Sequence, residues 1–115
     1  MDFNQNKPIY LQIAESICEK ILSGEYLPDE RILSVRELGV TLGVNPNTIA
    51  RVYEYLQGME IIYNKRGIGY FVSPSAPQLI MEQQRREFIQ NELPQVARKM
   101  KLLGVPLALL EQMLS

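Results

Sequence analysis

The stretch GVNPNTIARVYEYL, residues 43–56, places hydrogen-bonding side chains at the beginning of a segment with helical apolar spacing. Asn47, Thr48 and Arg51 lie within its first turns, and no acidic residue follows before Glu54. An amide, a hydroxyl and a guanidinium together supply directional hydrogen bonds and one positive charge. These groups are suited to contact a polar or anionic partner, and no residue beside them forms a nucleophile–base pair.

The residues around this group predict the start of a helix. Asn45 can cap the helix, because its side-chain oxygen can accept from a backbone N–H one turn on. Pro46 suits the first helical position, where its missing N–H is no loss. One helix face is apolar, through Ile49, Val52, Tyr53 and Leu56. We expect this face to pack inward, and we expect Asn45 to be a cap first and a contact residue second.

A shorter helix is expected directly before this one. Ser34 and Glu37 have the S-x-x-E spacing of a capping box. Arg36 lies in the first turn, and Gly43 ends the helix. Two short helices joined by a tight turn that contains glycine are typical of a helix-turn-helix.

A β-hairpin is expected after the two helices. The runs Ile61–Tyr63 and Tyr70–Val72 are rich in β-formers, and the glycine-bearing, basic segment NKRGIG lies between them. Upstream, a helix over 8–24 has isoleucines every four residues, with Cys18 on the same apolar side. The predicted fold is therefore mainly α with a small β-hairpin: a winged helix-turn-helix domain over residues 1–73.

For nucleic-acid binding, the positions of the charged residues are more informative than the net charge. Residues 1–72 contain seven bases and nine acids, which is unusual for a nucleic-acid-binding domain. Four of these bases lie where a winged helix meets a duplex, and they are Arg36, Arg51, Lys65 and Arg66. Each also has a simpler interpretation. Arg36 could pair with Glu37 or Asp29, Arg51 could pair with Glu54 or Tyr55, and Lys65, Arg66 and Gly67 could form only a polar hairpin tip.

Composition excludes several classes of function. The chain has 115 residues, one cysteine and no histidine, so a zinc site is not expected. There is no catalytic constellation and no glycine-rich phosphate loop, so we expect neither an enzyme nor a cofactor. No apolar run approaches the ~18 residues of a membrane-spanning helix, and we expect a cytoplasmic protein without a membrane partner.

The last 42 residues, 74–115, are expected to form a separate helical segment. It begins within the linker SPSAPQ, residues 73–78, and Asn91 is expected to cap one of its helices, with Pro94 in the first turn. A single tail of this length is too short to enclose a ligand cavity of the usual ~300 Å³ or more. It is long enough for dimerisation by helix packing.

The segments SVREL, LGVNPNT and RGIGYFV, in this order, resemble the GntR family of bacterial transcription regulators. The resemblance covers residues 8–72, and the short tail is similar to the YtrA-type subfamily. It implies a winged-helix domain, a homodimer and a pseudo-palindromic operator in double-stranded DNA. The family's contact positions correspond here to Arg36, Asn45, Asn47, Thr48, Arg51, Arg66 and Gly67.

Two departures concern base recognition. Many relatives have arginine at the positions of Pro46 and Ala50, so we expect Asn47 and Arg51 to carry more of the readout. Asn suits adenine and Arg suits guanine in the major groove. The resemblance further implies a repressor of its own operon, commonly beside an ABC transporter. A small-molecule effector at the dimer interface and a winged-helix module for protein partners are the alternatives left open.

Overall fold

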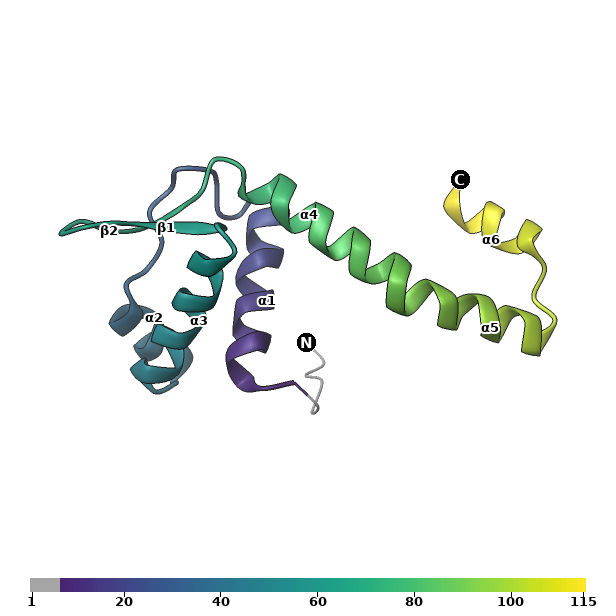
Figure 1. The fold of residues 1–115 in the computed structure, drawn as a ribbon, viewed down its shortest axis with the longest axis horizontal. Coiled ribbons are helices and arrows are strands. Elements are labelled where there is room, and N and C mark those ends of the chain that lie inside the picture. Colours follow the sequence, from purple (N-terminus) through teal and green to yellow (C-terminus); the bar gives the residue numbers. More distant parts are fainter. Residues whose placement is uncertain (1–6) are drawn as a thin grey trace. The chain divides into compact units, whose positions relative to one another are not determined.

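The computed structural model describes residues 7–115. The chain divides into two compact units, Met1–Met81 and Glu82–Ser115, which we describe separately. The first contains α1 (Ile9–Leu22), α2 (Val35–Leu42), α3 (Pro46–Gly58), β1 (Ile62–Lys65) and β2 (Gly69–Val72), with the beginning of α4 (Ala76–Glu87). Figure 1 shows α1, α2 and α3 beside one another and the β1–β2 hairpin projecting from them. This is the predicted winged helix-turn-helix.

Helix α3 is the centre of the first unit, because both α1 and α2 pack against it. Its predicted inward face is confirmed: Ile49, Val52, Tyr53 and Leu56 are at most 1% exposed. The Tyr53 hydroxyl donates to the Leu33 carbonyl at 2.5 Å, and burial raises the pKa of this phenol. Cys18 of α1 is buried in the same core, as expected.

Both predicted helix caps are present. The Ser34 hydroxyl accepts from the Glu37 backbone N–H while the Glu37 carboxylate accepts from the Ser34 N–H, each at 3.1 Å. The Asn45 side-chain oxygen accepts from the Asn47 N–H at 2.8 Å, and Pro46 is the first residue of α3. Gly43 ends α2 with φ 66°, a left-handed conformation that glycine adopts without steric cost. These local rules account for the helix-turn-helix.

The hairpin pairs β1 and β2 antiparallel, from Ile62 opposite Val72 to Lys65 opposite Gly69. Its tip is a tight turn in which the Ile68 N–H donates to the Lys65 carbonyl at 2.9 Å. Gly67 has φ 81°, the positive value that a type II turn requires at its third position. The predicted first strand was placed too early. Ile61 precedes β1, and its N–H donates to the Leu56 carbonyl at the end of α3.

The first turns of α4 belong to the first unit, because Ala76 and Ile80 are 0% and 1% exposed. By packing, the boundary between the units falls after Met81 rather than after Ser73. The functional division into residues 1–73 and 74–115 remains a prediction.

The second unit is helical. The end of α4 continues into the π-helix η1 (Phe88–Glu92), followed by α5 (Leu93–Leu103) and α6 (Leu107–Leu114). The expected new helix start with Asn91 as its cap is wrong, because the backbone stays helical through Glu92 and Leu93. Pro94 removes one helical hydrogen bond and crowds the preceding turn. The wider π-turn before it provides room for this residue.

Candidate nucleic-acid interface

The beginning of α3 presents the polar side chains that the sequence singled out. Asn45 and Asn47 are exposed, and Thr48 is half-buried. The side-chain oxygen of Asn45 already accepts from the Asn47 N–H, so its amide N–H groups are the part left for a partner. The Asn47 amide lies in the first turn of α3, where the helix dipole favours anionic ligands. The backbone N–H groups of Asn47 and Thr48 already donate to Asn45.

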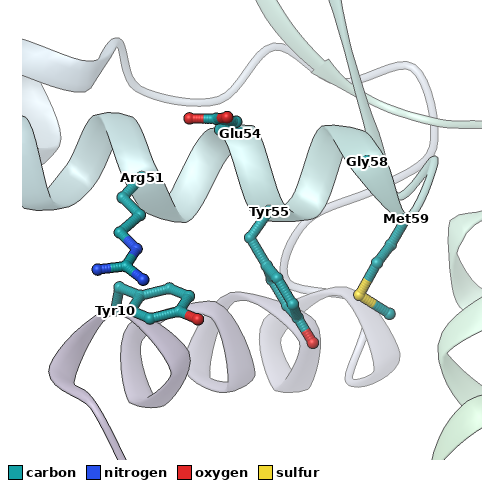
Figure 2. Close-up of a pocket in the computed structure, with 6 residues that line it drawn as sticks. All are labelled: Tyr10, Arg51, Glu54, Tyr55, Gly58 and Met59. Atoms are coloured by element: carbon teal, nitrogen blue, oxygen red, sulfur yellow. The ribbon is translucent and has the colours of Figure 1, made fainter.

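Arg51, one turn further along α3, makes a contact that the sequence did not indicate. Its guanidinium lies over the ring of Tyr10, with the guanidinium carbon 4.0 Å from the ring centroid. Tyr10 belongs to α1, and together with Tyr55 it lines a groove of about 400 Å³ between the two helices (Figure 2). Glu54 also borders this groove. In the described part of the chain it forms no ion pair with Arg51.

Arg36 lies near the start of α2 with an exposed side chain. Its neighbour Glu37 is engaged in the capping box, and the hydrogen bond from the Ser34 backbone is the main cause of a lowered Glu37 pKa. Among residues 7–115, Arg36 has no ion-pair partner, so the alternative pairing with Glu37 or Asp29 is not what the structure shows.

The wing carries the other predicted cations. Lys65 ends β1, and its ammonium lies 4.8 Å from the centroid of the Phe71 ring. Arg66 and Gly67 form the turn, and both are exposed. Ile68, beside them, is 59% exposed, so the tip combines the exposed Arg66 side chain with an apolar side chain.

Arg31 is a basic residue near this wing that the sequence reasoning missed. It forms an isolated β-bridge with Phe71. Its Nε lies 3.0 Å from the point where a Cβ on Gly69 would be, so a larger residue there would require the Arg31 side chain to shift. The φ of Gly69, 145°, also favours glycine at this position. The backbone of Ile32 also donates to Tyr70 at 3.0 Å. The segment before α2 is thereby joined to the wing.

The segment before α2 thus brings Arg31 beside the wing, and Arg36 follows on α2 itself. The turn between α2 and α3 leads directly to Asn45 and Asn47. Arg51 is held at the α1 side of α3.

Within the described residues no group of three or more histidine, cysteine, aspartate or glutamate side chains could hold a metal ion. No helix in this part of the chain is long and apolar enough to cross a membrane.

A helix-turn-helix with an exposed polar recognition helix and a basic wing defines a winged-helix DNA-binding domain. Residues 9–72 match the family described as bacterial regulatory proteins, gntR family. The chain belongs to this family of transcriptional regulators.

Individual relatives agree with this assignment. The chain is 32% identical to the HTH-type transcriptional repressor YtrA of Bacillus subtilis, over 97% of this chain and 85% of that protein. It is 46% identical to a GntR-family regulator from Bacteroides thetaiotaomicron of known structure, with TM-score 0.77 and 92% of each chain covered. The AraR DNA-binding domain, solved with operator ORR3, is 32% identical over 64% of this chain and 88% of its own, with TM-score 0.57.

Proposed function

We propose that this protein is a homodimeric repressor that binds a pseudo-palindromic operator upstream of its own operon. The observation that carries the proposal is the exposed start of α3 together with a wing tip whose Arg66 has no ion-pair partner among the described residues. The similarity to the repressor YtrA and to the operator-bound AraR domain supports it. A regulator of chromosomal DNA would act in the cytoplasm.

We assign the DNA contacts to the residues that the sequence indicated. Asn47, Thr48 and Arg51 would face base edges in the major groove, with Arg36 and Asn45 at the adjacent backbone. Lys65, Arg66 and Gly67 would enter or approach the minor groove. Arg31 adds a cation beside the wing, and its position supports a phosphate contact there.

The second unit would join two copies. No residue of α5 or α6 is buried, although both helices carry large apolar side chains: Leu93, Val96, Leu102, Leu103, Leu107, Leu109, Met113 and Leu114. Isolated helices of this length are marginal in water, because helix stability in proteins comes mostly from packing. A second copy would cover these side chains and place two recognition helices about 34–36 Å apart. An effector, if one is used, would bind at that interface.

The test is a fluorescence-anisotropy titration of the full chain on DNA from upstream of its gene and on a scrambled duplex, at several salt concentrations. A repressor should bind the native fragment much more tightly, with affinity that falls steeply as salt rises. Arg66→Ala should reduce the salt slope by about two units, one for each subunit of the dimer. Lys20→Ala, at the far end of α1, is the matched control and should leave the slope unchanged.

Two results would contradict the proposal. Equal, weak binding to both duplexes would be followed by selection from genomic fragments, and failure to enrich any site would favour the protein–protein module. Tight binding without repression of a reporter gene placed downstream of the fragment would show that the protein recognises an operator but is not a repressor.

A further inference from the structure

The Tyr10 ring packs against the Arg51 guanidinium, and other contacts fix the position of the ring. Its ring meets the Tyr55 ring edge-on, with centroids 6.0 Å apart and an interplanar angle of 76°. Both tyrosines are half-buried and pack against the core of the first unit. Figure 2 shows the Tyr10 ring beneath the guanidinium and Tyr55 further along the groove. The aromatic surface under Arg51 is therefore a fixed part of the α1–α3 packing.

The contact with the Tyr10 ring uses none of the Arg51 hydrogen-bond donors in the described part of the chain. The N–H groups of a guanidinium point outward in its own plane, whereas an aromatic ring occupies only one face of that plane. Within residues 7–115, Arg51 has no hydrogen-bond or ion-pair partner. A long, flexible side chain loses conformational freedom on binding, and a side chain that is already oriented loses less. The stack therefore orients an arginine whose donors remain available.

We infer that Tyr10 is a positioning residue for operator recognition: it orients the Arg51 guanidinium so that its in-plane donors face a base or phosphate of the duplex. The inference rests on the proposed function, because it needs Arg51 to contact DNA. It extends the recognition surface from α3 to the first turn of α1. It also explains why a surface arginine that has no acidic partner among residues 7–115 lies against α1.

A double-mutant cycle in the full chain tests this inference. The variants are Tyr10→Leu, Arg51→Ala and the double substitution, measured by anisotropy on the operator fragment and on scrambled DNA. A cation–π contact at an exposed site corresponds to roughly a two- to fivefold effect on an equilibrium. We expect Tyr10→Leu to weaken operator binding by about this factor for each half-site when Arg51 is present. It should have no effect in the Arg51→Ala background.

Two further variants separate positioning from general packing. Tyr10→Phe keeps the ring face and should restore wild-type affinity. Tyr26→Leu removes another half-buried tyrosine that lies beneath a cation, Lys20, with 5.5 Å between ammonium and ring centroid. It should leave operator affinity unchanged in both Arg51 backgrounds. Thermal unfolding of each variant shows whether the fold is retained.

An equal loss of affinity from Tyr10→Leu in both backgrounds, or no loss in either, would overturn the inference while leaving the proposed function intact. If the wild-type protein bound no operator, the result would contradict both the proposed function and this inference. If Tyr10→Leu does not fold, the Nε–H resonance of Arg51 in wild type decides. A ring-current shift in the operator complex supports positioning, and its absence there refutes it.

Discussion

At the scale of single residues, Cys18 gives the most direct test of the core. It is the single cysteine of the chain, and burial raises its pKa from 9.0 to about 11, with smaller contributions from Glu15 and Glu19. At pH 8 this difference alone lowers the thiolate fraction about 100-fold. We expect a disulfide reagent to label the folded protein at least that much more slowly than the urea-unfolded chain, by absorbance of the released thiol.

The same shift has a consequence for stability at high pH. Because the folded pKa of Cys18 lies above the unfolded value, its contribution to stability is complete below pH 9 and is lost as the pH rises toward about 11. Rapid labelling of the native protein at pH 8 would instead show that α1 opens locally, since the thiolate is the reactive form.

Residue roles could be predicted where they follow from local rules. The Ser34–Glu37 box and the Asn45 cap depend on neighbours within one helical turn, and both form as expected. The stack of Arg51 on Tyr10 could not be predicted, because it depends on how α1 packs against α3. The approach of Arg31 to Gly69 is likewise a tertiary contact between distant segments.

At the scale of secondary-structure elements, the capping box determines where α2 begins. Ser34→Ala removes the acceptor of the Glu37 N–H and should destabilise the fold by about 1 kcal/mol, measured by urea unfolding at pH 7. Ser23→Ala is the control, because that hydroxyl donates only to a carbonyl near the end of α1. Equal losses from the two substitutions would show that the cap has no special role.

The charged half of the box adds a pH dependence with the opposite sign to that of Cys18. The pKa of Glu37 is lowered from 4.5, chiefly by the hydrogen bond from the Ser34 backbone. Its contribution is therefore present above the unfolded value and is lost as the pH falls through the folded pKa.

The close approach of α2 to the following turn depends on Gly39. A Cβ at this position would lie 2.9 Å from the Val44 carbonyl oxygen, which is backbone and cannot easily move. Gly39→Ala should therefore cost roughly 1–3 kcal/mol through overpacking. Gly58, in the last turn of α3, has nothing within 4 Å of its Cβ position. Gly58→Ala should instead stabilise by about 0.5 kcal/mol.

Chemical unfolding of the two alanine variants compares the same substitution in two packing environments. If Gly39→Ala were as stable as Gly58→Ala, the helix-turn-helix would have more room than the structure shows.

The elements themselves were largely predictable from hydrophobic periodicity and turn residues. The start of the first strand was not predicted. The Ile61 N–H donates a hydrogen bond to the Leu56 carbonyl at the end of α3, so the strand begins one residue later. The π-helix before Pro94 was also missed. The sequence shows Pro94, but a π-turn adds only one residue to a helical turn and does not change the apolar spacing enough to be recognised.

At the scale of the whole molecule, the SPSAPQ segment is a compositional boundary that the packing does not follow. Proline and serine indicate a linker, yet Ala76 and Ile80 complete the core of the first unit. A fragment that ends at residue 73 would expose that core, so the tail's role should be tested by substitution in the full chain.

The apolar tail supports the final prediction. Leu103 and Leu107 are 71% and 64% exposed at the end of α5 and the start of α6. If a second copy covers them, the double substitution Leu103→Glu and Leu107→Glu places charges in an apolar interface. Charged groups without partners are costly to bury. We expect a monomer by light scattering, with operator affinity lowered on the order of 100-fold, since two half-sites no longer bind together.

Leu27→Glu is the matched control, because Leu27 is 57% exposed and lies in the first unit, between α1 and α2. It should leave both mass and affinity unchanged. A double variant that remains dimeric would move the dimer interface away from α5 and α6. A monomeric variant that kept full affinity would show that one winged helix suffices, and the pseudo-palindromic operator would lose its structural reason.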